Sequence, residues 1–277
     1  MRRLMVAVVM VGIAQSAQAG SWLDLPILRG DLSDEPAAVR QVVWAGSYVG
    51  GQGSYGSANM DFGKATSDQV AYLLRNTTIE SEFSVSQWPA MGQLSTNASG
   101  LGGFVGYNWQ WGEAVLGLEA NYLHSSFSGG MSDTMSRTFT TSDDYSNTVT
   151  VDSTASMNVK DMLSFRARAA WATGNYLPYA FGGVAIGRAD IVRSATVTAS
   201  GNYVGSTTPA PAPYSYGPIT ASESQLNRVI YGYAAGLGLD VMVVGNVFAR
   251  VEWEHTRFAT PVDVQINTVR GAVGMKF

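Results

Sequence analysis

Residues 247–257, Val-Phe-Ala-Arg-Val-Glu-Trp-Glu-His-Thr-Arg, alternate between an apolar and a charged side. The alternate positions from Val247 to Trp253 are apolar. The positions between and after them carry Arg250, Glu252 and Glu254. Because successive side chains of a β-strand point to opposite faces, the stretch is predicted to be a strand. Its three charges on one face need either water or one another.

Seven further segments of strand length repeat this alternation. In most of them a face of Leu, Val, Tyr and Trp is opposed by a face of Gly, Ala, Asn and Ser with a few charges. The first and the fifth alternate less cleanly because glycines interrupt them. The segments are 43–55, 101–111, 116–124, 163–171, 177–188, 229–241 and 267–277.

The connections between these segments alternate in length. Short turns rich in Gly and Asn lie at 111–113, 173–175 and 244–246. The other connections cover 56–98, 125–160 and 189–228, with a shorter one near 258–266. Short periplasmic turns and long external loops are typical of outer-membrane barrels. With both chain ends on the turn side the strand number is even, so eight antiparallel strands are predicted to close a transmembrane barrel.

The long connections have a biased, polar composition. Residues 125–160 are dense in Ser, Thr and Asp, whereas 208–213 read Thr-Pro-Ala-Pro-Ala-Pro. The proline-rich run is expected to be extended or disordered. Within the first loop, 138–140 and 149–151 have β-forming residues that are expected to continue their hairpin beyond the bilayer.

The N-terminus has the organisation of a secretory signal. Arg2 and Arg3 precede an apolar run over 4–13, and Ala17-Gln18-Ala19 fits the small-residue cleavage rule. The predicted division is a signal peptide at 1–19, a periplasmic segment at 20–42 and a barrel domain at 43–277. The apolar run is too short for a spanning helix, which needs roughly 20 residues.

The composition narrows the function classes. Only 14% of the 277 residues are charged, and the chain holds 31 Gly, 13 Tyr, 7 Trp and no Cys. Soluble domains average about 25% charged residues. The formal charge of −4 does not suit a nucleic-acid partner, whose phosphates call for a basic surface.

The polar faces indicate which side of the barrel meets lipid. A lipocalin-type soluble barrel, the main alternative, would turn its apolar face inward. Small residues with interspersed charges suit a narrow interior instead, and an Arg facing mid-bilayer lipid would cost about 2–4 kcal/mol. Aromatic residues at strand ends suit interfacial girdles: Tyr107, Trp109, Trp111, Trp171 and Trp253. The predicted interior charge network is Glu119, Arg166, Arg168, Asp240, Arg250, Glu252, Glu254 and Arg270.

Three stretches carry a family resemblance: 44–51 (Trp-Ala-Gly-Ser-Tyr-Val-Gly-Gly), 102–109 (Gly-Gly-Phe-Val-Gly-Tyr-Asn-Trp) and 270–277. The chain resembles the small outer-membrane β-barrel proteins of alpha-proteobacteria, with the eight-stranded architecture of the OmpA transmembrane domain. The resemblance implies that Val273, Met275 and Phe277 form a recognition signal for the outer-membrane insertion machinery. Family members are described as envelope-structural, porin-like, surface antigens or haem-binding.

Few motifs point to chemistry. Residues 51–56 match G-x-G-x-x-G, but no helical pattern follows them as a dinucleotide site requires. A lipid-modifying enzyme would use His124 or His255 with a neighbouring hydroxyl or carboxylate, and those neighbours are Ser125, Ser126 and Glu254. A haem site would use the same histidines with Tyr203, Tyr214 and Tyr216. The two histidines lie on strands three and seven, so they are not expected to meet.

We therefore expect a non-enzymatic outer-membrane barrel without cofactor or metal, with a structural and surface-interaction role. The expected partners are outer-membrane lipid and lipopolysaccharide, the insertion machinery, and extracellular or host ligands that contact the loops. The alternatives are a porin-like pore for small solutes, a haem or ligand receptor, and the lipid-modifying enzyme. Eight strands leave little room inside beyond side chains, which weighs against the pore.

Overall fold

The computed structural model describes residues 42–89, 91–259 and 262–277. The predicted signal peptide, and the predicted periplasmic segment up to residue 41, lie outside the described residues. Within the described part, no helix is both long enough and apolar enough to cross a membrane.

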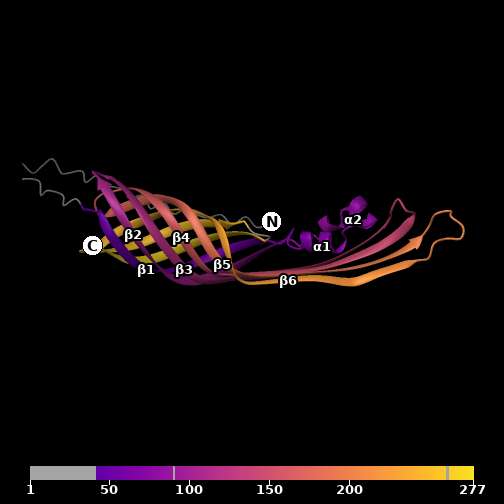
Figure 1. Ribbon diagram of the computed structural model, residues 1–277. Helices are drawn as coiled ribbons and strands as arrows, with labels where there is room; N and C mark the ends of the chain where they lie inside the picture. The colour runs from indigo at the N-terminus through magenta and orange to yellow at the C-terminus, as the bar shows by residue number, and fades with distance from the viewer. Residues whose placement is uncertain (1–41, 90, 260–261) are drawn as a thin grey trace, which may run out of the picture. The chain divides into compact units, whose positions relative to one another are not determined.

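Eight antiparallel strands form a closed barrel in sequence order, as the alternation predicted. The ring closes where β1 pairs with β8, for example Tyr48 with Lys276. Figure 1 shows the strands wound around a common axis. The strands are β1 (Gly46–Asp61), β2 (Gln93–Trp111), β3 (Ala114–Thr140), β4 (Tyr145–Trp171), β5 (Tyr176–Tyr203), β6 (Tyr214–Val244), β7 (Val247–Phe258) and β8 (Asp263–Lys276).

The three predicted short turns join β2 to β3, β4 to β5 and β6 to β7. Each contains one glycine with a left-handed backbone: Gly112 at φ 61°, Gly174 at 57° and Gly245 at 54°. That region penalises residues with a Cβ. The turn glycines therefore fix the hairpin geometry that the spacing predicted.

The wall of the barrel alternates as expected. Apolar side chains point outward and are exposed, and Leu101 is 74% exposed and Tyr231 69%. The girdle aromatics are also on the outside, with Trp109 41% and Trp111 60% exposed. An apolar exterior fits lipid, whereas the soluble-barrel alternative required the apolar face inside.

The strand lengths correct the predicted loops. Most of 125–160 and 189–228 is strand, because β3 to β6 continue far past the ends predicted for them (Figure 1). The continuation of the hairpin through 138–140 and 149–151 is confirmed, and the proline run at 208–213 lies in the connection between β5 and β6. The dense Ser and Thr content obscured an alternation that persists in these stretches, since every second residue of Val149–Val159 is buried.

We call the continued parts of β3 to β6, residues 126–140, 145–160, 189–203 and 214–228, the extension. It is a four-stranded sheet in which each strand pairs with the next. Its outward side carries a lattice of hydroxyl side chains that bond across strands, for example Ser136 with Thr150 at 2.9 Å and Thr196 with Thr220 at 2.8 Å.

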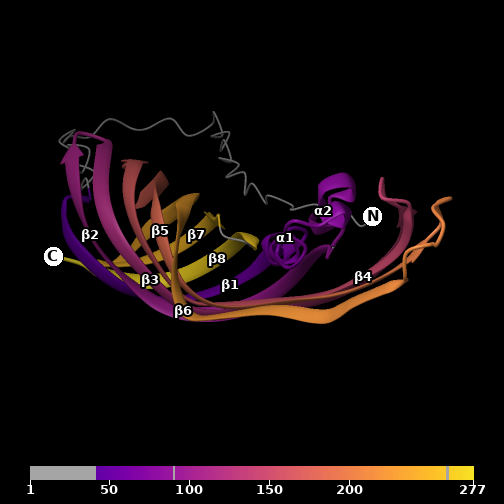
Figure 2. The same ribbon diagram turned by 45° about the vertical axis from the view of Figure 1, so that its right-hand side comes forward.

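The predicted loop at 56–98 contains three short helical elements. These are α1 (Ser67–Leu73), α2 (Thr78–Phe83) and the 3₁₀ turn η1 (Val85–Gln87). We call residues 62–89 the strap, and Figure 2 shows its helices over one face of the extension. Its apolar side chains pack on the inner face of the sheet. They are Val70, Leu74, Ile79, Val85 and Trp88, against Val149, Val151, Ala195, Val197 and Ala199.

Candidate functional site: the barrel interior and the outer rim

The barrel interior holds a balanced cluster of four arginines and four carboxylates. All eight side chains point inward from β3, β4, β6, β7 and β8, and each residue is at most 3% exposed. They occupy the inward positions of the alternating strands, opposite the lipid-facing residues. The members are Glu119, Arg166, Arg168, Asp240, Arg250, Glu252, Glu254 and Arg270.

Glu119 and Asp240 each bind both Arg250 and Arg168 within the cluster. Arg250 Nη1 lies 2.8 Å from Glu119 Oε2, and its Nε lies 2.7 Å from Asp240 Oδ1. Arg168 shares both carboxylates, at 3.2 Å from Glu119 and 2.7 Å from Asp240. Because each charge has two or more opposite partners, none is buried without compensation.

Arg166 links Glu119 to a second group of charges, which contains Glu252, Glu254 and Arg270. Its Nη1 lies 2.7 Å from Glu252 Oε1 and 2.7 Å from Glu254 Oε2, and it also pairs with Glu119. Arg270 pairs with Glu254 and lies 3.3 Å from Glu252. The result is one continuous network that links five strands around the barrel.

Aromatic rings surround this network. Tyr48 donates to Glu119 at 2.8 Å and Tyr179 donates to Glu252 at 2.8 Å. The guanidinium of Arg168 lies 3.8 Å from the centre of the Tyr179 ring. Space for Tyr48 depends on a glycine, since a Cβ at Gly106 would lie 2.3 Å from the Tyr48 hydroxyl. Sequence analysis did not identify these tyrosines as partners, because they come from strands whose glycines weaken the alternation.

Apolar clusters lie in the interior on either side of the charged layer. At the turn end the cluster consists of Trp44, Tyr48, Phe104, Val115, Leu177 and Phe248. At the other end a larger cluster joins the barrel wall to the start of the strap, and Met60, Phe62, Phe127 and Phe258 are each at most 1% exposed. Side chains therefore fill the interior in three successive layers.

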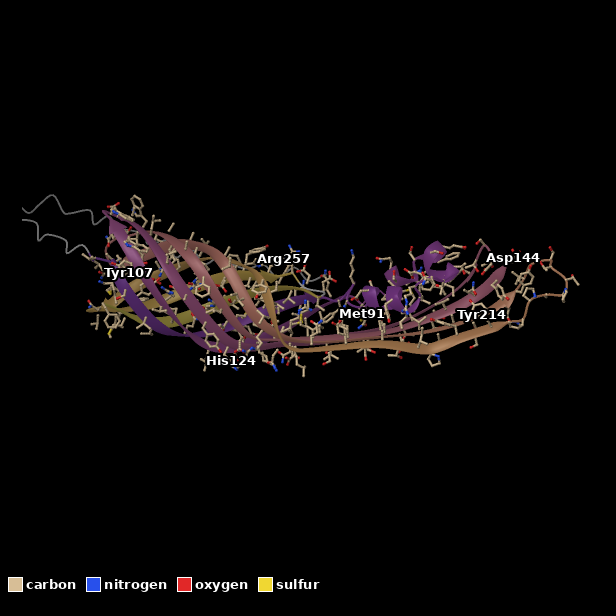
Figure 3. All side chains as sticks on the ribbon, in the orientation of Figure 1. Met91, Tyr107, His124, Asp144, Tyr214 and Arg257 are labelled. Atoms are coloured by element: carbon tan, nitrogen blue, oxygen red, sulfur yellow. The ribbon has the colours of Figure 1, made fainter. Side chains whose placement is uncertain are left out.

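The histidines lie on the outside of the wall and apart from each other. His124 Nδ1 lies 2.8 Å from Asp161 Oδ1 on β4, and His255 Nδ1 lies 3.0 Å from Asn267 Oδ1 on β8. Figure 3 shows His124 on the barrel wall, far from the tip of the extension. Asp161 was not identified from the sequence, because only the hairpin register brings position 161 beside position 124.

The other residues of the enzyme hypothesis are not assembled around a histidine. Ser125 is buried, and Ser126 donates to Asn158 at 3.1 Å. Glu254 points into the interior network, whereas the adjacent His255 points outward. Neighbours along a strand face opposite sides, so sequence proximity brought together groups that the fold separates.

The structure does not bring the tyrosines of the haem hypothesis near His124. The strand register places Tyr214 at the level of Phe139 on β3, through the successive pairs Tyr214–Gly201, Gly201–Asn147 and Asn147–Phe139. Phe139 and His124 are separated along β3 by about 50 Å at strand spacing. Tyr203 donates to Thr207 at 2.7 Å, and Tyr216 donates to the Leu73 carbonyl at 3.0 Å. Among the described residues, no cluster of three or more His, Asp and Glu side chains is arranged to hold a metal ion.

The residues of the last strand implied as an insertion signal share the outward face. Val273, Met275 and Phe277 are 62%, 44% and 65% exposed. The Phe277 amide donates to the Ser47 carbonyl at 2.8 Å, which ties the end of the chain to the first strand.

A second charged group lies on the outer rim, where the extension leaves the barrel. Lys160 Nζ lies 2.5 Å from Asp190 Oδ2, and Arg188 Nη1 lies 3.9 Å from Asp161 Oδ2. Inside the extension, buried Arg193 fastens the strap through Asp68 at 2.9 Å and through the Ala65 carbonyl at 2.6 Å, and it also pairs with Glu223 on β6. Sequence analysis placed Lys160, Asp190, Arg193, Asp68 and Glu223 in loops, and Arg188 at the end of a predicted strand.

One protein-family model and several solved structures match the chain. No curated protein matches the chain. The chain is similar in structure to the attachment invasion locus protein Ail of Yersinia pestis, at 13% identity and TM-score 0.36, over 84% of this chain and 99% of that one. It is also similar to Neisserial surface protein A, at 11% identity and TM-score 0.35, over 84% and 98%.

A third similar structure is the N-terminal β-barrel domain of Pseudomonas aeruginosa OprF, at 12% identity and TM-score 0.30, over 82% of this chain and 97% of that one. The family model described as the outer membrane protein beta-barrel domain matches residues 5–277. That match spans nearly the whole chain, and with the closed eight-stranded ring and its apolar exterior it places the protein in the outer membrane of a Gram-negative cell. The chain belongs to the outer membrane protein β-barrel domain family.

Proposed function

We propose that this protein anchors a binding platform on the cell surface. In this proposal the barrel is a closed anchor, its interior stabilised by the eight-residue charge network. The extension and the strap then project outside the cell and present a surface to other molecules. The observation that carries the proposal is the continuation of β3 to β6 beyond the barrel as an ordered sheet packed against the strap.

An ordered extension favours a binding role over mere connection. A simple connection between strands needs only a few residues, whereas here four strands and three helical elements build a separate apolar core. The resemblance to alpha-proteobacterial surface antigens supports the same role. The proposed partners are extracellular or host molecules at the extension, lipopolysaccharide around the wall, and the insertion machinery at the last strand through Val273, Met275 and Phe277.

The pore and enzyme alternatives receive less support. The three filled layers of the interior oppose a pore, and the separation of Glu254 from His255 opposes the enzyme as it was formulated. The tyrosines of the haem alternative bond to the extension and the strap, far from His124.

Cysteine labelling on intact cells tests the proposed orientation. The chain has no Cys, so one introduced thiol is a unique target. A membrane-impermeant maleimide is expected to label Ala210→Cys, between β5 and β6, in intact cells. The matched variant Asn175→Cys, in the turn between β4 and β5, is expected to react only after lysis. The reverse pattern, with Asn175→Cys labelled on intact cells, would refute the surface platform.

A further inference from the structure

The first strand of the extension has one side without a partner strand. β3 continues to Thr140, but its pairing with β2 ends where Gly100 meets Ser125. From Phe127 to Thr140 it pairs only with β4, and the register of that pairing is uninterrupted. We call the side of residues 127–140 that faces away from β4 the β3 edge.

The register shows which backbone groups lie on the β3 edge. Near the tip, the Thr141 amide donates to the Tyr145 carbonyl at 3.0 Å, so these two residues form a hydrogen-bonded pair. Hydrogen-bonded and non-hydrogen-bonded pairs alternate along an antiparallel ladder. The even-numbered residues of β3 therefore turn their N–H and C=O groups away from β4. They are Ser128, Gly130, Ser132, Thr134, Ser136, Thr138 and Thr140.

The backbone groups of these seven residues are open to a partner. Within residues 42–89, 91–259 and 262–277, no backbone hydrogen bond connects them to the strap or to another strand. All seven residues are exposed, and together they cover roughly 40 Å of strand. A row of donors and acceptors of that length is a template for a further strand.

The opposite edge of the extension is protected against such pairing. It belongs to β6, which pairs with β7 only at residues 232–244. Two register shifts interrupt the pairing of β6 with β5, and Pro218 has no N–H group to donate. Gly217 before it has a left-handed backbone at φ 87°. Bulges and prolines keep edge strands from pairing, and residues 127–140 of β3 contain neither.

On the side of the strap, an apolar layer is only half covered at the β3 edge. Met131, Met135 and Phe139 pack against the apolar clusters of the barrel mouth and the strap, and they are half-buried. On the next strand inward the same layer is covered, with Val151 1% and Ala155 0% exposed. An added strand would place every second side chain over this layer, and apolar side chains at those positions would gain by burial.

The same side carries one cation without a counter-charge. Arg137 is exposed, and its guanidinium lies 4.9 Å from the centre of the Trp88 ring. Among the described residues no carboxylate pairs with Arg137, and Asp133, the other charged residue of this stretch, has a contact of its own. Opposite charges on neighbouring strands stabilise their pairing. An acidic side chain on the added strand would therefore complement Arg137.

We infer that the β3 edge binds an extended peptide segment of another protein as an additional strand of the extension. The segment has apolar residues at alternate positions with an acidic residue among them. In such strand addition the main-chain hydrogen bonds give affinity, and the alternate side chains give specificity. The inference rests on the proposed surface platform and names the part of that platform that binds.

A second copy of the chain fits the β3 edge less well. Two copies inserted the same way both run β3 outward from the membrane, so their β3 edges would pair in parallel. Parallel pairing is slightly less stable per residue than antiparallel pairing. An antiparallel pair between copies would need the β6 edge of the neighbour, which its bulges and Pro218 protect.

Peptide binding to the full chain, refolded in detergent, tests the inference. The probe is a fluorescent peptide of alternating Thr and Val in which a central Val is replaced by Glu, and anisotropy measures its binding. The wild-type protein is expected to bind it saturably. The double variant Thr134→Pro, Thr138→Pro removes two N–H groups of the β3 edge and spares the ladder to β4. It is expected to bind about tenfold or more weakly, since two hydrogen bonds are lost.

Three controls separate backbone pairing from other contacts. The matched variant Thr134→Val, Thr138→Val changes the same side chains but keeps their N–H groups, so it is expected to bind as wild type. The probe N-methylated at alternate residues, on the edge that would pair, is expected not to bind the wild-type protein. Arg137→Gln is expected to weaken binding of the Glu-containing probe about two- to fivefold, as loss of an exposed ion pair does.

Amide exchange by NMR locates the bound peptide. The probe is expected to slow exchange at Ser132, Thr134 and Ser136, whose N–H groups face the β3 edge. Exchange at Asp133 and Met135 is expected to stay unchanged, because their N–H groups already bond to β4. This alternation of affected and unaffected residues is specific to strand addition at the edge.

Several results would overturn the inference. They are absence of saturable binding to the wild-type protein, equal binding by the proline variant or by the N-methylated probe, and slowed exchange along 214–228 instead of the β3 edge. A dimer of the wild-type protein that the proline variant loses would make a second copy the occupant. Each variant is first checked for the gel shift of a folded barrel on heating, and the N-methylated probe tests the same bonds on unaltered protein.

Failure of the inference is distinguishable from failure of the proposed function. Cysteine labelling on cells reports only which end of the barrel faces outside. Peptide binding in detergent reports on the β3 edge whichever way the barrel is inserted. Surface labelling without peptide binding would keep the platform and remove this partner, whereas peptide binding with reversed labelling would keep the edge site and refute the platform.

Discussion

At the scale of single residues, the interior arginines depend on their carboxylates. Arg250 is 2% exposed and joins Glu119 to Asp240. Burying charges is costly, and in the interior only opposite charges and hydrogen bonds offset the loss of water. The network is thus more sensitive to removal of one partner than to replacement of the whole set.

Arg250→Leu is expected to lower the free energy of unfolding by about 3–5 kcal/mol, because Asp240 and Glu119 lose a buried counter-charge. Urea titration of the protein refolded in detergent, followed by Trp fluorescence, measures the change. The matched variant Arg257→Leu removes an exposed pair and is expected to cost at most about 1 kcal/mol. Equal losses in the two variants would show that the interior network does not stabilise the barrel.

At the scale of elements, the strap is tied to the extension by a few polar contacts above its apolar core. Arg193 contacts Asp68 on α1 and Glu223 on β6. The Tyr216 hydroxyl donates to the Leu73 carbonyl at the end of α1. These contacts join helices and strands that are far apart in the sequence.

The strap is expected to loosen in acid. The hydrogen bond from Arg193 lowers the pKa of Glu223 below its usual value. A lowered pKa in the folded state contributes stability above the unfolded value of about 4.3, and that stability is lost as the pH falls through the folded pKa. The protection factors of the amides at 67–88, which are exchange rates corrected for the intrinsic pH dependence of amide exchange, are therefore expected to be high at neutral pH and to fall below about pH 4.

Arg193→Gln provides the comparison for this pH dependence. It removes the partner of both Glu223 and Asp68, so the protection factors of the strap are expected to be lower at neutral pH and less dependent on pH. Protection factors in the wild-type protein that stay constant down to pH 3 would contradict the role given to this contact.

The start of α2 shows what a local sequence pattern predicts and what it leaves to tertiary packing. Thr77 caps the start of α2, and its side chain accepts from the Glu80 amide at 3.2 Å. The spacing Thr-x-x-Glu at 77–80 is a helix-start signal that was available in the sequence. Six- and seven-residue helices are too short to stabilise themselves, so packing on the extension, rather than the local pattern, determines that they form.

At the scale of the whole molecule, the three layers of the interior close the barrel to solute. The apolar cluster around Trp44 and Phe248, the charge network and the apolar cluster around Phe62 follow one another along the axis. An ion would have to pass two apolar layers and displace paired charges.

Protein reconstituted in planar lipid bilayers is accordingly expected to give no stepwise conductance. The double variant Trp44→Ala, Phe248→Ala opens only the first layer, so it is expected to remain closed as well. Single-channel recording measures both proteins, with a larger-barrel porin in the same bilayer as the positive control. Regular conductance steps from the wild-type protein would establish a pore and overturn the closed-anchor proposal.

The sequence by itself determined the barrel. Period-two alternation and turn glycines act within one strand or one hairpin, so the strand number, the turns and the lipid-facing side could all be predicted from local pattern. The inward positions of Arg250, Glu252 and Glu254 followed from the same alternation. The contacts of Glu252 and Glu254 with Arg166 and Arg270, and those of Arg250 with Glu119 and Asp240, are consistent with the expected charge network.

Tertiary structure alone decided the rest. The strands of the extension are stabilised by pairing with neighbouring strands and by packing against the strap. Their sequence is dense in Ser and Thr, so its composition does not reveal this packing. Asp161 meets His124, and Glu223 meets Arg193, because hairpin register brings distant positions side by side. Register and cross-strand packing depend on the whole closed ring, and no single stretch of sequence contains them.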